Sequence, residues 1–154
     1  MRTHRVLALT ALVPLVVAAV NCSDSQGGPN VVDTFTADLA AWPNVVTTAT
    51  GQASFTLFDD NTVSYEITVN NIQNVIGAHV HEGGPGATGP ILVGFFGGLF
   101  SGSDVLAEGT FDASDLSGMA FDELVTRMST GTVYVNVHTQ ANPGGEIRGQ
   151  IMDQ

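Results

Sequence analysis

The sequence predicts an all-β fold, namely an antiparallel, Greek-key-like β-sandwich or flattened barrel of about eight strands with one short helix before a C-terminal hairpin. From position 34 onward, apolar and polar residues alternate with a period of two, which is typical of strands that bury one face. Clusters of Gly, Asp, Asn and Pro interrupt this alternation at intervals typical of turns. A length of 154 residues is sufficient for one domain and hardly for two.

The alternation in the first half of the domain predicts three strands. Residues 35–39 and 53–57 alternate in the first two, and the third covers 63–69, where Val, Tyr and Ile alternate with Ser, Glu and Thr. The Asp-Asp-Asn segment at 59–61 favours a turn. We therefore expect the second and third strands to form a hairpin with one solvated face.

The middle of the chain predicts three further strands. Residues 78–81 and 91–95 flank a loop rich in Gly and Pro, and residues 105–111 form another expected strand, weakened by Gly109. The glycines of this loop are expected to serve as turn residues rather than as a phosphate cradle, because no helix follows them.

The helix and the last hairpin follow. Apolar residues in 119–130 recur at helical spacing, acidic residues occupy the first turn, and Gly131 follows as a stop. Residues 133–137 and 147–151 then alternate on either side of the turn-forming sequence Asn-Pro-Gly-Gly. This predicts a short helix that covers one end of the sheets, followed by a C-terminal hairpin.

The N-terminus predicts export. Two arginines precede an apolar run at 6–20, which is too short to span a bilayer but has the length of a signal-peptide core. The single cysteine, Cys22, follows at once and resembles the lipidated residue of a bacterial lipoprotein. Ordinary cleavage near Ala19 is the alternative. Both interpretations place the protein outside the cytoplasm, either as a membrane-anchored lipoprotein (periplasmic or at the cell surface) or as a secreted protein.

The expected organisation is a signal peptide at 1–21, a polar tether at 22–33 and one domain at 34–152. The formal net charge is −11, and all four Lys+Arg residues are arginines. Such a chain cannot neutralise a row of phosphates, so we expect no nucleic-acid binding, and membrane contact only through an N-terminal lipid. One cysteine also excludes an internal disulfide framework.

Two motifs give the sequence a family resemblance. The first is Gly-Ala-His-Val-His-Glu-Gly at 77–83 with Gly-Ala-Thr-Gly-Pro-Ile at 86–91; the second is Gly-Thr-Val-Tyr-Val-Asn-Val-His-Thr at 131–139 with Pro-Gly-Gly-Glu-Ile-Arg-Gly-Gln at 143–150. Together they resemble the CHRD domain, which is named after repeats in chordin and also occurs in exported microbial proteins. The resemblance implies a β-sandwich-like module outside the cytoplasm. We expect a non-enzymatic binding or structural protein, with no catalytic residues, whose partner is an envelope or extracellular ligand.

Three histidines are the candidate metal ligands. His79 and His81 share one face of their strand, because residues two apart point to the same side. In the later strand the valines occupy the core face, so Tyr134, Asn136 and His138 are expected to point outward. If the two strands are neighbours, the three imidazoles converge on a surface site suited to copper or zinc.

The C-terminal hairpin supplies candidates for the residues around that site. Its most natural register pairs His138 with Glu146 and Asn136 with Arg148, which places them on one face. Glu146, Arg148, Asn136 and Glu82 are the expected supporting residues around the ligands. The alternative to a metalloprotein is a cluster of polar side chains that serves only packing, and the sequence leaves both open.

Overall fold

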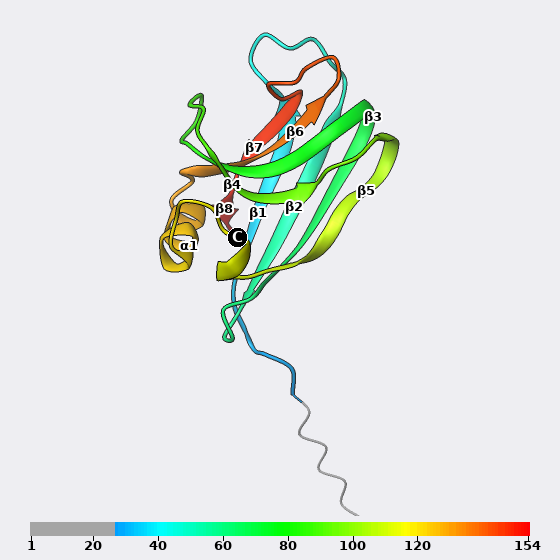
Figure 1. Cartoon of the computed structure of the whole chain (residues 1–154). Helices are drawn as coiled ribbons and strands as arrows, with labels where there is room; N and C mark the ends of the chain where they lie inside the picture. The colour runs from blue at the N-terminus through cyan, green and yellow to red at the C-terminus, as the bar shows by residue number, and fades with distance from the viewer. Residues whose placement is uncertain (1–26) are drawn as a thin grey trace, which may run out of the picture.

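The computed structural model describes residues 27–154, and the predicted all-β class is confirmed (Figure 1). The expected signal peptide at 1–21 and Cys22 lie outside these residues. No helix in the described part of the chain is long and apolar enough to cross a membrane. The elements are β1 (Val31–Ala41), β2 (Thr50–Phe58), β3 (Val63–Glu82), β4 (Ile91–Phe96), β5 (Phe100–Phe111), the 3-10 turn η1 (Ala113–Asp115), α1 (Phe121–Ser129), β6 (Val133–Thr139), β7 (Ile147–Gln150) and β8 (Met152–Asp153).

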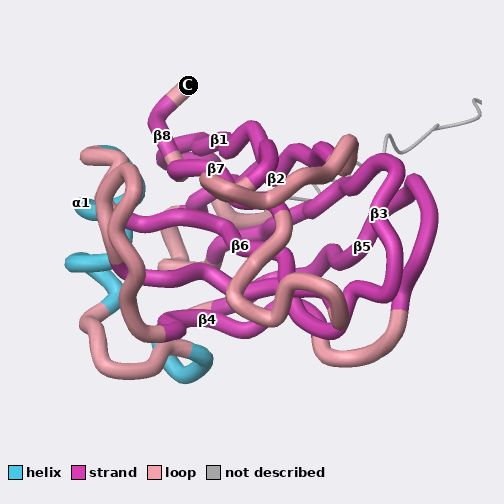
Figure 2. The backbone as a smooth tube through the Cα atoms, turned by 90° about the horizontal axis from the view of Figure 1, so that it is seen from above, coloured by secondary structure: helices cyan, strands magenta, loops and turns pink. Residues whose placement is uncertain are grey.

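The strands form one antiparallel sheet that closes into a flattened barrel (Figures 1 and 2). Neighbours run in the order β2-β1-β7-β6-β3-β4, and β3 pairs a second time with β2. This second pairing closes the ring, because β3 meets both ends of the path from β2 to β6. β5 and β8 extend the sheet beside β3 and β1 respectively. Closure removes most unpaired strand edges from the barrel wall.

β3 is the longest element, and the sequence did not predict its length. The alternation indicated two strands at 63–69 and 78–81, whereas the structure has one strand of 20 residues. Two irregularities in its pairing with β5 coincide with positive φ angles at Asn71 and Asn74. The backbone N–H groups of these asparagines donate to the hydroxyl oxygens of Ser103 and Ser101, each at 2.8 Å. These bulges let one strand bend from the β2–β5 side of the barrel to the β4–β6 side.

The core follows the predicted alternation. Val80, Val135 and Ile147 are fully buried between the walls of the barrel, as the pattern requires. The expected helix is present as α1, and it buries Phe121, Leu124 and Met128 against the barrel core. The faces of β3, β6 and β7 that point away from the core are thereby determined, and they carry the candidate site.

Candidate metal centre

The structure brings the three candidate histidines together. β3 and β6 are antiparallel neighbours, and His138 pairs with Gly77, two residues before His79. All three side chains therefore project from the same side of the sheet. One ring nitrogen from each of His79, His81 and His138 lies within 4.8 Å of the others. No other cluster of this kind occurs within residues 27–154.

The polar face of β6 is covered, whereas the sequence predicted a surface site. Tyr134 is 2% exposed, Asn136 4% and His81 8%. The loop between β3 and β4 folds over this face, and so does the turn between β6 and β7, which Asn136 holds by donating from Nδ2 to the Gly144 carbonyl at 3.1 Å. The face assignment was right, but the strand pattern contains no information about what two long loops cover.

Two backbone carbonyls orient two of the rings. His81 Nδ1 lies 3.0 Å from the Gly89 carbonyl oxygen, and His138 Nδ1 lies 2.9 Å from that of Pro143. A carbonyl can only accept a hydrogen bond, so each Nδ1 carries the proton and each neutral ring has a bare Nε2. Gly89 can approach His81 this closely because it lacks a Cβ, which would collide with the Glu82 carbonyl.

His79 is the third ring and has a different environment. Its Nδ1 is buried and has no hydrogen-bond partner among the described residues. Gly77 leaves space for the ring, since a Cβ there would lie 3.0 Å from His79 Cε1. Burial, and to a smaller extent the nearby His138 and His81, lower the pKa of His79 to about 4.

His81 shifts in the same direction. Burial lowers its pKa most strongly, the Gly89 hydrogen bond partly opposes this, and the charges of His138 and Arg148 add to the lowering. Both His79 and His81 are therefore neutral at pH 7, which is the form that ligates a metal.

Arg148 lies beside the histidines without touching them. The expected register of the last hairpin is present for Asn136 opposite Arg148 and Tyr134 opposite Gln150, whereas the expected pair of His138 with Glu146 is not among the strand pairings. The Arg148 guanidinium is sandwiched between two aromatic rings, 4.0 Å from the centroid of Trp42 and 3.3 Å from that of Tyr134. Tyr134 in turn stacks on His81, with centroids 5.2 Å apart and planes at 11°. The side chains thus form a continuous stack that ends at a candidate ligand.

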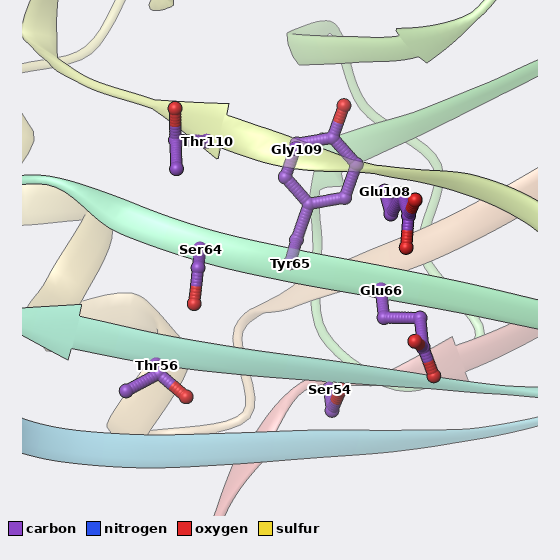
Figure 3. Close-up of a pocket in the computed structure, with 8 residues that line it drawn as sticks. All are labelled: Ser54, Thr56, Ser64, Tyr65, Glu66, Glu108, Gly109 and Thr110. Carbon is purple, nitrogen blue, oxygen red and sulfur yellow. The ribbon is translucent and has the colours of Figure 1, made fainter.

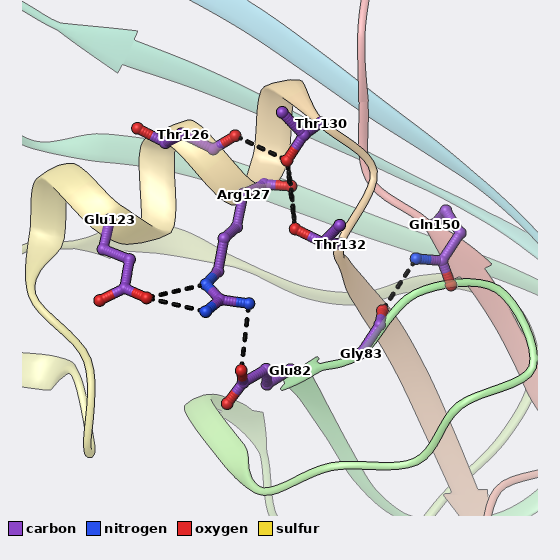
Figure 4. A network of polar contacts seen from close by, with 8 residues as sticks. All are labelled: Glu82, Gly83, Glu123, Thr126, Arg127, Thr130, Thr132 and Gln150. Carbon is purple, nitrogen blue, oxygen red and sulfur yellow. Dashed lines mark hydrogen bonds and ion pairs between the residues drawn. The ribbon is translucent and has the colours of Figure 1, made fainter.

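Neither candidate glutamate contacts the imidazoles. Glu82 forms an ion pair with Arg127 at 3.0 Å, and Arg127 also pairs with Glu123 on α1 (Figure 4). This pair joins the end of β3 to the helix. In the same view Gln150 Nε2 donates to the Gly83 carbonyl at 3.0 Å, which fixes the start of the covering loop.

Glu146 has a structural set of partners. Its carboxylate accepts hydrogen bonds from the hydroxyls of Thr47 and Thr139, each at 2.7 Å, and from Asn142 Nδ2 at 3.0 Å. Burial raises its pKa, but the three hydrogen bonds together outweigh burial and the net shift is downward.

Sequence reasoning missed Thr47 and the carbonyls of Gly89 and Pro143, because their positions depend on loop conformations that leave no side-chain pattern.

A shallow groove lies elsewhere, on the outer side of β2, β3 and β5 (Figure 3). Its volume is about 490 Å³, and no basic side chain lines it. Glu66 and Glu108 are direct cross-strand partners there. The lining residues are Ser54, Thr56, Ser64, Tyr65, Glu66, Glu108, Gly109 and Thr110.

Comparison with known proteins identifies the family. The sequence model of the CHRD domain matches residues 33–151. Chordin of Xenopus laevis is 31% identical over 121 residues, which cover 71% of this chain and 12% of chordin. The chain thus spans about an eighth of that relative's length. No solved structure matches. A match over most of the described chain, with both histidine motifs inside it, shows that the protein belongs to the CHRD domain family.

Proposed function

We propose that this CHRD domain is a non-enzymatic module that binds one copper or zinc ion through His79, His81 and His138. The observation that carries the proposal is the 3.4 Å separation between the Nε2 atoms of His81 and His138. When both rings are neutral both atoms are bare, because both Nδ1 atoms donate to carbonyl oxygens. Two lone pairs that face each other at this distance repel, and a cation between them converts the repulsion into attraction.

The distance also suits a metal. Two ligand bonds of about 2.0–2.1 Å that meet at the tetrahedral angle place their nitrogen atoms about 3.3–3.4 Å apart. Neutral imidazole suits both zinc and copper, and three protein ligands leave a fourth position open. The buried, unpartnered Nδ1 of His79 supports the same conclusion, since a buried polar atom without a partner is costly. The alternative of simple polar packing leaves the buried Nδ1 of His79 without a partner.

Metal titration of protein purified without a histidine tag tests this function. We expect one copper(II) or zinc ion per chain at pH 7, measured by equilibrium dialysis and elemental analysis. Since the sequence contains a single tryptophan, which stands in the aromatic stack beside the site, copper(II) should also quench Trp42 fluorescence. Stoichiometries near zero for zinc and for copper in both oxidation states would contradict the proposal.

We further propose that the module acts outside the cytoplasm, anchored by a lipid on Cys22 or secreted after cleavage near Ala19. Support comes from the apolar run before Cys22 and the polar residues after it. The physiological ligand or partner would then be an envelope or extracellular molecule, with the metal as part of the recognition surface or as cargo for transfer.

The mass of the protein recovered from its own cell envelope tests the anchor. An acylated chain that begins at Cys22 is expected, and Cys22→Ser should release the protein from membranes. A chain that retains Met1 would contradict export, and a secreted chain that begins near position 20 would favour ordinary cleavage.

A further inference from the structure

Arg148 is a buried cation whose charge is not neutralised. It is 8% exposed, and its guanidinium donates to the carbonyl oxygens of Ala87 at 2.7 Å and Gly84 at 3.4 Å and to Gln150 Oε1 at 2.7 Å. All three acceptors are neutral. Within residues 27–154 the ion pairs involve Arg127 and not Arg148. A guanidinium that is mostly buried and has only neutral acceptors is weakly screened by water. Its positive charge therefore acts strongly on the groups around it.

A single aromatic ring, that of Tyr134, separates the charge of Arg148 from the histidine site. Arg148 lies 3.3 Å from one face of Tyr134, and His81 stacks on Tyr134. The intervening ring excludes water, so the interaction between the guanidinium and an ion held by His81 is weakly screened. Trp42 covers the outer side of the guanidinium at 4.0 Å and prevents it from swinging away.

Among residues 27–154, no carboxylate contacts the candidate ligands, so no negative charge at the site offsets the charge of Arg148. The candidate ligands are three neutral imidazoles, and the two glutamates in the motifs are directed elsewhere, Glu82 to Arg127 and Glu146 to Thr47 and its neighbours. A divalent ion would therefore keep its whole charge in a partly buried site beside another cation. The repulsion from Arg148 scales with the charge of the ion, and the cost of removing the ion from water scales with its square.

We infer that Arg148 makes the three-histidine site selective for copper(I) over copper(II) and zinc. This inference rests on the proposed metal-binding function and names the ion for that same site. Copper(I) carries one charge instead of two, and three ligands satisfy it, whereas zinc takes a fourth ligand, which here would be a water molecule. No electron transfer by the protein is involved, because copper enters as copper(I). Arg148 touches no ligand atom; it determines specificity through its charge.

Competition with chelators under anaerobic conditions tests the selectivity. Copper(I) affinity is measured against bathocuproine disulfonate, and copper(II) and zinc affinities are measured against chelators of known strength. Wild-type protein is expected to bind copper(I) more tightly than either divalent ion. A wild type that prefers copper(II) or zinc would overturn the inference while leaving metal binding itself intact, and absence of binding by all three ions would contradict the proposed function first.

Charge variants separate electrostatics from packing. Arg148→Gln retains hydrogen-bond donors for the covering loop but removes the charge, and should tighten copper(II) binding about tenfold more than copper(I) binding. Arg148→Lys retains the charge and should keep the wild-type ratio, provided far-UV circular dichroism shows a folded protein. Glu66→Gln, an exposed change on β3 outside the site, serves as the matched control and should leave the ratio unchanged. An unchanged ratio in Arg148→Gln would reject the role of Arg148.

Discussion

Replacing His81 by alanine is expected to weaken the binding of the preferred metal ion by at least about 100-fold. His81 contributes one of three ligands, and even residues that only orient ligands typically contribute about 10–100-fold to affinity. Removal of His81 also eliminates the pair of facing Nε2 atoms that favours a cation at the site. Equilibrium dialysis or chelator competition at pH 7 measures the effect.

The controls for this variant distinguish ligand loss from unfolding. Because His81 stacks on Tyr134, its removal also perturbs packing, so thermal unfolding of the metal-free protein should be compared with wild type. Glu66→Ala lies on the same strand and should bind metal as wild type does. Wild-type affinity in a folded His81→Ala protein would reject the three-histidine site.

Replacing Glu146 by alanine is expected to lower the free energy of unfolding by about 3 kcal/mol or more. The side chain is 8% exposed and accepts three hydrogen bonds, from Thr47, Thr139 and Asn142. Hydrogen bonds to charged groups contribute about 1.5–3 kcal/mol each, and Thr139, which is fully buried, would lose its acceptor. Urea denaturation monitored by circular dichroism measures the loss.

The contribution of Glu146 to the free energy of unfolding is expected to decrease at acidic pH. The pKa of Glu146 is lower in the folded protein than in the unfolded chain, so its stabilisation is fully present above the unfolded pKa of 4.5 and is lost as pH falls through the folded value.

Glu66→Ala should change stability by less than about 0.5 kcal/mol, as exposed substitutions do. Glu146→Gln should retain near-wild-type metal affinity. A tenfold loss in that variant would instead assign Glu146 the ligand-orienting role that the sequence first indicated.

The barrel strands were largely predictable because burial imposes a period of two on them. Val80, Val135 and Ile147 are buried where the pattern put them, and the hairpin register from Tyr134 opposite Gln150 to Asn136 opposite Arg148 follows from matching the two apolar faces. The helix was equally clear from its spacing of apolar residues. The continuity of β3 was not predictable, since its asparagine-rich centre has the composition of a turn.

The sequence by itself therefore determined the all-β class, the faces of the strands and the three histidines that share a side, because alternation is a local property of the chain. The tertiary structure alone decided that β3 and β6 are neighbours and that loops bury His81 and partly cover the site. It also decided that carbonyl oxygens, rather than Glu82 or Glu146, orient the rings. Backbone carbonyls are present at every residue, so no side-chain pattern marks the two that meet an imidazole, and only the path of the loops brings them there.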